Sequence, residues 1–200
     1  NEKSVQIGIP DGTQTSFVRW VNDDNIIVGL RALIPVPGIT QRIYISRAIG
    51  VNRITSKVTK LMWDSGGQNA ADIMWIPSDG RSEILLAAQY TIYSNFPEFW
   101  PTVYRVDVAT GRKRAVLKGR ENVYDWNADA SGRIRTGMRY AQGSRKFTLL
   151  YRGEAGEDSF SGIDTADSRK ECCGHSCFCQ AQTMLWLCTM TAQAARRFSR

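Results

Sequence analysis

Residues that could do chemistry gather near the end of this 200-residue sequence. All five cysteines and the only histidine lie between positions 172 and 188, most of them in the run Cys-Cys-Gly-His-Ser-Cys-Phe-Cys that begins at Cys172. Thiolates and imidazole are zinc ligands, and a metal site is one interpretation of this run. The spacing argues against it, because paired ligands in closed zinc sites are typically separated by two to four residues, and here the gaps are zero or one.

The same run contains the nearest approach to a serine nucleophile. Residues 174–178 read Gly-His-Ser-Cys-Phe, whereas a hydrolase elbow needs Gly-x-Ser-x-Gly, since only small neighbours permit its strained turn. A triad also needs a histidine separate from the elbow, and His175 is the only one. We expect no catalytic residue, metal ligand or cofactor in this chain. Two acidic clusters lie in predicted turns, where acids are common: Asp23 and Asp24, and Glu154, Glu157 and Asp158.

Residues 172–200 differ in character from the rest of the chain. They contain no acidic residue, and the alternation of apolar and polar residues stops. One interpretation is an amphipathic helix from about Ala181 to Ala195, too short to span a membrane. Another, which we favour, is that this tail is translated out of frame, because a shifted reading from Ser176 is compatible with a strand, a turn and a second strand. In that case the cysteines say nothing about the redox compartment.

The elements that precede the tail are predicted to be strands. In residues 73–119 an apolar run ends at the turn Ser-Asp-Gly (78–80), a second apolar run covers Ile84 to Ala88, and residues 103–108 alternate at the strand period of two. Thr110-Gly111 marks another turn, before a last apolar run at 115–117. This pattern predicts one four-stranded antiparallel unit, which needs neighbours to cover its apolar faces.

Two weaker copies of this unit lie at residues 17–61 and 123–163. Trp20, Trp75 and Trp126 recur in them at intervals of 55 and 51 residues, long for short propeller repeats of about 40 to 45 residues. The sequence therefore predicts an all-β fold, a partial β-propeller of about three four-stranded antiparallel blades (17–61, 73–119 and 123–163), with an irregular or helical C-terminal tail. An ordinary antiparallel sandwich is the alternative. Residues 1–16 are expected to be the lead-in strand of a preceding blade, and we expect a piece of a longer chain.

Two connections stand out. Residues 34–38 (Ile-Pro-Val-Pro-Gly) are predicted to form a loop, since proline lacks the N–H that a sheet requires. The aromatic loop, residues 90–101, is dense in large rings. It either projects as an adhesive segment that contacts a substrate or another domain, or folds back over the edge of its sheet. The candidate contact residues are Tyr90, Tyr93, Phe96, Phe99 and Trp100.

The net charge of +7 is dispersed along the chain. The densest basic run, Arg112-Lys113-Arg114, falls at a predicted hairpin and has no interleaved aromatic residues, so we expect no nucleic-acid partner. No apolar run reaches the roughly 18 residues that a spanning helix needs, and no targeting segment is visible, so we expect no membrane partner. The compartment stays open between bacterial cytoplasm and periplasm.

Several phrases resemble the N-terminal propeller of the prolyl oligopeptidase family, the dipeptidyl aminopeptidase and acylaminoacyl peptidase group. They are residues 18–23 (Val-Arg-Trp-Val-Asn-Asp), 75–80 (Trp-Ile-Pro-Ser-Asp-Gly), 103–112 (Val-Tyr-Arg-Val-Asp-Val-Ala-Thr-Gly-Arg) and 159–164 (Ser-Phe-Ser-Gly-Ile-Asp). The resemblance implies a parent protein in which a seven- or eight-bladed propeller restricts the access of short peptides to the serine triad of an α/β-hydrolase domain. The partners implied are that domain and peptide substrates. The alternative is a stand-alone propeller that binds a protein or a glycan.

Overall fold

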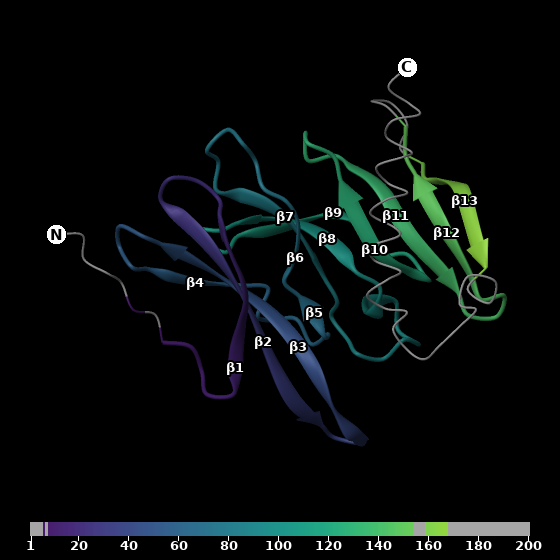
Figure 1. Cartoon of the computed structure of the whole chain (residues 1–200), viewed down its shortest axis with the longest axis horizontal. Coiled ribbons are helices and arrows are strands. Elements are labelled where there is room, and N and C mark those ends of the chain that lie inside the picture. The colour runs from purple at the N-terminus through teal and green to yellow at the C-terminus, as the bar shows by residue number, and fades with distance from the viewer. Residues whose placement is uncertain (1–5, 7, 154–158, 168–200) are drawn as a thin grey trace, which may run out of the picture.

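In the part of the chain that the structure describes, the regular structure is almost entirely β-strand. The computed structural model describes residue 6, residues 8–153 and residues 159–167, and in that part of the chain thirteen strands are joined by turns and one short 3-10 turn, η1 (Pro97–Phe99) (Figure 1). The strands form three sheets, and each contains four consecutive antiparallel strands. The expectation of an all-β chain with three four-stranded antiparallel units is confirmed. The cysteine-rich tail lies outside the described residues.

The strand bounds follow the chain order within each sheet. The first sheet contains β1 (Thr13–Trp20), β2 (Asn25–Val36), β3 (Ile39–Asn52) and β4 (Val58–Leu61), and the short β5 (Asn69–Ala70) runs parallel to β3. The second sheet contains β6 (Asp72–Trp75), β7 (Glu83–Ala88), β8 (Thr102–Asp107) and β9 (Lys113–Leu117). The third sheet contains β10 (Val123–Ala128), β11 (Ile134–Ala141), β12 (Lys146–Tyr151) and β13 (Ser161–Asp167). Strand β1 thus takes in the end of the segment expected as a lead-in.

Turn chemistry explains why the first strand of each sheet stops where it does. The side-chain oxygen of Asn22 accepts hydrogen bonds from the backbone N–H groups of Asp24 and Asn25, at 3.1 and 2.9 Å. Asp79 does the same for Arg81, at 3.2 Å, and Asp129 for residues 131 and 133. Such side chains replace ladder bonds and favour a turn over further strand.

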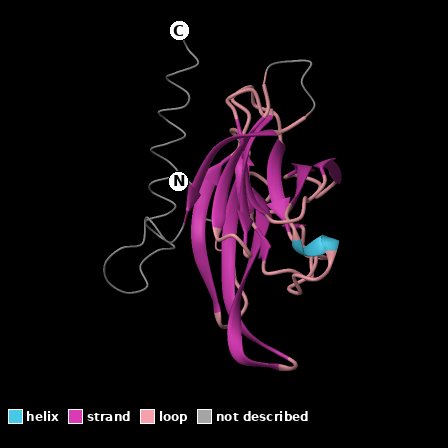
Figure 2. Cartoon of the chain, turned by 90° about the vertical axis from the view of Figure 1, so that its right-hand side faces the viewer, coloured by secondary structure: helices cyan, strands magenta, loops and turns pink. Residues whose placement is uncertain are grey.

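The predicted proline-rich loop is wrong in its extent. Strand β2 continues through Pro35 to Val36, and the chain reverses only at Pro37 and Gly38, whose φ is 79°. The ladder between β2 and β3 skips Pro35, because the register shifts between Ile34 and Val36. An irregularity in the ladder accommodates the missing donor. The β2–β3 hairpin is therefore long, and it extends beyond the other strands of its sheet (Figures 1 and 2).

The three sheets pack face to face in chain order. One buried cluster lies between the first and second sheets and includes Ile27, Ala48, Leu61, Ile84, Leu86 and Val106. A second lies between the second and third sheets and includes Leu85, Ala87, Val103, Val123, Trp126 and Ile134. The second sheet is therefore covered on both faces, which explains why β7 is a continuous apolar run rather than an alternating one. The first strands of neighbouring sheets, β6 and β10, also contact each other.

Glycine permits the close approach of the first two sheets. An added Cβ at Gly50, in β3, would lie 2.3 Å from the backbone oxygen of Val108, in the chain that follows β8. No side chain fits in that distance, so the backbones of the first and second sheets are nearly in contact there.

Candidate functional site

The aromatic loop is closed on itself. The Tyr90 N–H donates to the Glu98 carbonyl at 2.9 Å, and the Phe96 N–H donates to the Tyr93 carbonyl at 3.2 Å. The turn η1 follows, and Trp100 leads the chain into β8. The loop is a compact excursion between β7 and β8 rather than an extended arm.

Three of its five aromatic side chains pack against the protein. The ring of Tyr90 lies 6.0 Å from that of Tyr104 on β8. Trp100 is buried and makes edge-to-face contacts with Phe99 at 5.0 Å and with Tyr124 of β10 at 5.1 Å. These residues fix the loop across the second and third sheets, the role expected of a loop that folds back.

Tyr93 and Phe96 are exposed. Each is 50% exposed at the tip of the loop. Large rings held in solvent on a closed loop are typical of a contact surface, since Tyr and Phe bury large areas when a partner arrives. Of the five candidate contact residues, these two are the ones available to a partner.

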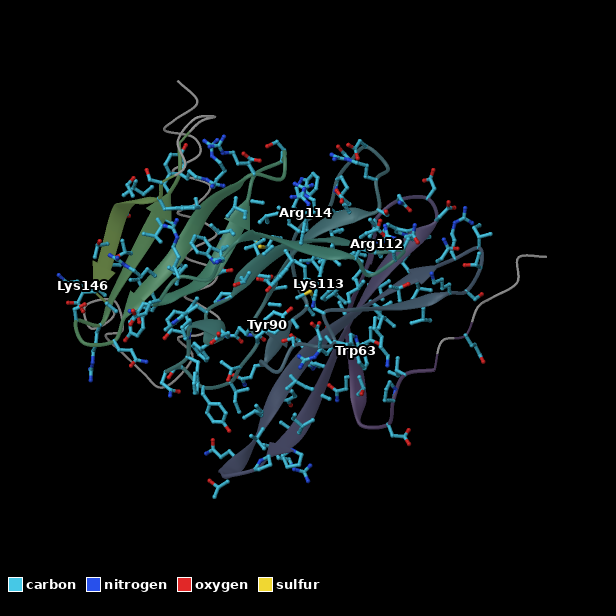
Figure 3. The ribbon with its side chains drawn as sticks, turned by 180° about the vertical axis from the view of Figure 1, so that it is seen from behind. Trp63, Tyr90, Arg112, Lys113, Arg114 and Lys146 are labelled. Carbon is cyan, nitrogen blue, oxygen red and sulfur yellow. The ribbon has the colours of Figure 1, made fainter. Side chains whose placement is uncertain are left out.

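One residue of the basic run, Lys113, is held by contacts with the rest of the protein. Lys113 of β9 donates hydrogen bonds to the carboxylate of Asp64 and, at 2.8 Å, to the hydroxyl of Tyr90. Figure 3 labels Lys113 and Tyr90. Burial opposes the charge on Lys113, but the bonds to Asp64 and Tyr90 outweigh it and raise the pKa of the lysine. The hydrogen bond from Lys113 lowers the pKa of Asp64. Lys113 therefore ties β9 to the loop before β5. All three residues of the run keep exposed surface.

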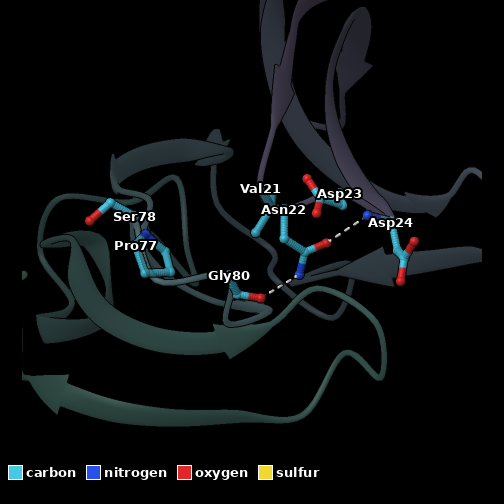
Figure 4. A pocket seen from close by; sticks show the side chains of 7 residues that line it. All are labelled: Val21, Asn22, Asp23, Asp24, Pro77, Ser78 and Gly80. Atoms are coloured by element: carbon cyan, nitrogen blue, oxygen red, sulfur yellow. Dashed lines mark hydrogen bonds between the residues drawn. The ribbon is translucent and has the colours of Figure 1, made fainter.

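A shallow hollow lies between the first two sheets at their β1–β2 and β6–β7 turns. Its lining comprises Val21, Asn22, Asp23, Asp24, Pro77, Ser78 and Gly80 (Figure 4). The Asn22 amide bridges it by donating to the Gly80 carbonyl at 3.0 Å. The hollow is open to solvent, and its polar contacts join two turns, so its role is structural. Asp23 and Asp24 lie at its edge, as the sequence placed them, in a turn; Glu154, Glu157 and Asp158 lie outside the described residues.

Two carboxylates on the first strands of neighbouring sheets are electrostatically perturbed. Asp72 is on β6 and Asp125 is on β10. Loss of hydration, followed by repulsion from Asp125, raises the pKa of Asp72 to about 6, against an opposing attraction from Arg19 of β1. Desolvation also raises the pKa of Asp125. Asp72 nevertheless keeps exposed surface. Its carboxylate is therefore surrounded by protein on most sides and open to solvent on one side.

This carboxylate pair is what sequence analysis missed. Asp72 begins β6 and Asp125 lies within β10, each directly beside apolar residues, but only the tertiary structure brings the two sheets together. Carboxylates with raised pKa values are good acceptors for a cationic or hydrogen-bond-donating ligand and mark functional sites more often than average. Two carboxylates are too few for a metal cage, and among the described residues no three His, Cys, Asp or Glu side chains form a potential metal site.

Comparison with known proteins adds no further constraint, because no family model, curated protein or solved structure matches this chain. Within the described part of the chain, no helix has the length and apolar character required to cross a bilayer. The potential nucleophile and zinc residues, from Cys172 to Cys188, lie outside the described residues. The candidate site therefore consists of Asp72 and Asp125, with Tyr93 and Phe96 as a separate contact surface.

Proposed function

We propose that this chain is a non-catalytic segment of a β-propeller that, in a parent serine peptidase of the prolyl oligopeptidase family, controls the access of peptides to an α/β-hydrolase domain. The observation that carries the proposal is the serial packing of three four-stranded antiparallel sheets, each face to face with the next in chain order. Blades of a propeller repeat in this way, around a common axis next to which their first strands lie.

The carboxylate pair supports a role in peptide passage. In a propeller, Asp72 and Asp125 would face the central opening from adjacent blades, together with Arg19 of the blade before. Two carboxylates at such an opening attract the amino termini and basic side chains of peptides and repel acidic ones. The proposed role is thus to select among short peptides by charge and size, with no chemistry performed by this chain.

Sequencing of the encoding DNA tests the peptidase origin. We expect a second frame, overlapping codons 165 to 200, that continues the strand pattern and leads to Gly-x-Ser-x-Gly with a later Asp and His. An intact present frame, with further strand repeats and no such motif downstream, would contradict it. An activity assay complements this test. The purified chain should not cleave chromogenic peptides or esters, and turnover that disappears in Ser176→Ala would refute the non-catalytic proposal.

The exposed rings favour a second candidate, a stand-alone module that binds a protein or a glycan. Tyr93 and Phe96 lie on a closed loop and are half exposed, as in surfaces that bind by aromatic contact. Binding on a glycan or protein array that is lost in the double variant Tyr93→Ser, Phe96→Ser, but not in Asp72→Asn, would favour this candidate over peptide gating.

A further inference from the structure

The first sheet has an apolar face that points away from the rest of the protein. Residues that face the second sheet include Ile27, Ala48 and Leu61. Side chains alternate along each strand, so their neighbours point outward. Two cross-strand rows result, Val18–Val28–Ile49–Lys60 and Trp20–Ile26–Val51–Val58. We call these rows the outer face of the first sheet. They include a buried cluster of their own, separate from the cluster between the sheets.

On this outer face, apolar side chains of β1 and β4 are exposed on either side of the buried Val28, Ile49 and Val51. Trp20 is 62% exposed, Val18 59% and Val58 45%. Three large apolar side chains so exposed on one sheet face are more than the scattered exposed residues of an ordinary surface and mark an interaction site.

In the third sheet, the tryptophan that corresponds to Trp20 is covered by the preceding sheet. Trp126 ends the apolar part of β10 as Trp20 ends β1, and each points toward the side from which a preceding sheet would pack. For Trp126 that sheet is present. Its ring is 1% exposed, its indole N–H donates to the Pro101 carbonyl at 3.0 Å, and Phe160 lies 5.0 Å away. The equivalent side of Trp20 has no such cover among the described residues.

The opposite end of the stack has the complementary kind of face. Gly137 and Leu150 pair on the side toward the second sheet, so the adjacent pairs Met138–Leu149 and Tyr140–Phe147 point away from it. These four residues, which are partly exposed, are the outer face of the third sheet. It is the same type of face that the second sheet presents to Trp126. Among the described residues, one face of each of the two types that pack inside the molecule is therefore left without a covering sheet.

We propose that the outer face of the first sheet binds the outer face of the third sheet of a second copy of this chain, so that the copies associate head to tail. The contact would continue the sheet stacking already seen twice within one molecule. Charge is complementary as well, since Lys60 lies on the last main strand of the first sheet and Asp164, paired with Leu149, lies on the last strand of the third. The proposal depends on sheet packing and not on the proposed function.

Because the proposed contact joins two different faces, each face can be disabled by its own substitution. Trp20→Glu disables only the first-sheet face and Phe147→Glu only the third-sheet face. In sedimentation velocity or multi-angle light scattering, each variant alone should lose self-association by at least about thirtyfold, as expected for a central aromatic anchor. A mixture of the two should form a 1:1 dimer through the one intact pair of faces. The control Tyr44→Glu changes a residue of similar exposure, 58%, on the opposite face of β3, and should associate as the wild type does.

Other outcomes would overturn the proposal. A wild-type chain that stays monomeric from about 1 to 300 μM, a span that covers weak interfaces, has no such contact. If Phe147→Glu associates normally while Trp20→Glu does not, two first-sheet faces bind each other instead. If only Phe147→Glu fails, the third-sheet face binds itself. Circular dichroism melts verify that each variant is folded. If a glutamate variant does not fold, the serine variant at the same position, Trp20→Ser or Phe147→Ser, is used in its place. Because peptide cleavage is not measured here, failure of this test leaves the proposed function intact.

Discussion

Trp126 should be the most costly aromatic residue to remove from the third sheet. It is 1% exposed, fills the space above Gly137, whose added Cβ would lie 2.6 Å from the indole ring, and donates its N–H to Pro101. Truncation of a buried Trp to Ala costs about 3–5 kcal/mol through lost burial and the cavity left behind. The unpaired Pro101 carbonyl is part of that loss, at about 1 kcal/mol.

We therefore expect Trp126→Ala to lower the free energy of unfolding by about 4 kcal/mol. The matched control is Trp20→Ala, the corresponding residue of the first sheet, which is 62% exposed and should cost less than about 0.5 kcal/mol. Urea unfolding followed by far-ultraviolet circular dichroism measures both without relying on tryptophan emission. The experiment belongs at a concentration where the wild type is monomeric, so that association does not contribute.

Equal losses in the two variants, or a loss below about 1 kcal/mol for Trp126→Ala, would refute the packing of the second and third sheets described above. If Trp126→Ala is too unstable to measure, Trp126→Phe keeps most of the ring and should cost about 2 kcal/mol, from the lost hydrogen bond and a smaller cavity.

Three further changes test other parts of the structure. Asp72 has a folded-state pKa of about 6, above its unfolded value, so its contribution to stability is present at pH 4 and is lost as the pH rises through 6. Asp72→Asn should therefore stabilise the protein at pH 7 and change its stability little at pH 4. The pKa shift corresponds to roughly 3 kcal/mol, which we reduce to about 1 kcal/mol because the carboxylate is accessible to solvent. An equal change in melting temperature at both pH values would contradict this. Gly50→Ala should cost about 1–3 kcal/mol of stability, because the added methyl would meet the Val108 backbone. The control Gly143→Ala, with open space around it, should be nearly neutral. Similar melting temperatures of the two variants would show that the first two sheets are not in close contact. Tyr93→Ser should leave the unfolding free energy within about 0.5 kcal/mol of wild type, since the ring is half exposed, and a larger loss in urea titration would assign the ring to the fold.

Much of the local structure could be predicted from the sequence. Apolar runs and alternation located the strands, and Ser-Asp-Gly at 78–80 and Thr110-Gly111 marked turns between them, because these signals depend on residues close together in the chain. The extent of the β2–β3 hairpin could not be predicted. Proline at position 35 argues locally for a loop, but pairing with β3 on both sides of it holds the strand together through a shift of register.

The candidate site was only partly visible. The aromatic loop could be recognised by its composition, yet nothing in that composition separates Tyr90 and Trp100, which pack inward, from Tyr93 and Phe96, which do not. The difference arises from what lies opposite each ring, namely Tyr104 for Tyr90 and Tyr124 for Trp100. The carboxylate pair was not predicted at all, because Asp72 and Asp125 are 53 residues apart in sequence.

The sequence by itself determined the all-β class, the three four-stranded units and most of their turns, since hydrophobic period and turn chemistry are local properties. Tertiary structure alone decided which face of each sheet is covered. Trp20 and Trp126 have the same residue type, and both lie in the last part of the first strand of a sheet, yet one is exposed and the other is buried. The physical reason is that burial depends on the neighbouring sheet, and for Trp126 that sheet is built from the preceding strands β6 to β9, which the residues around Trp126 do not include.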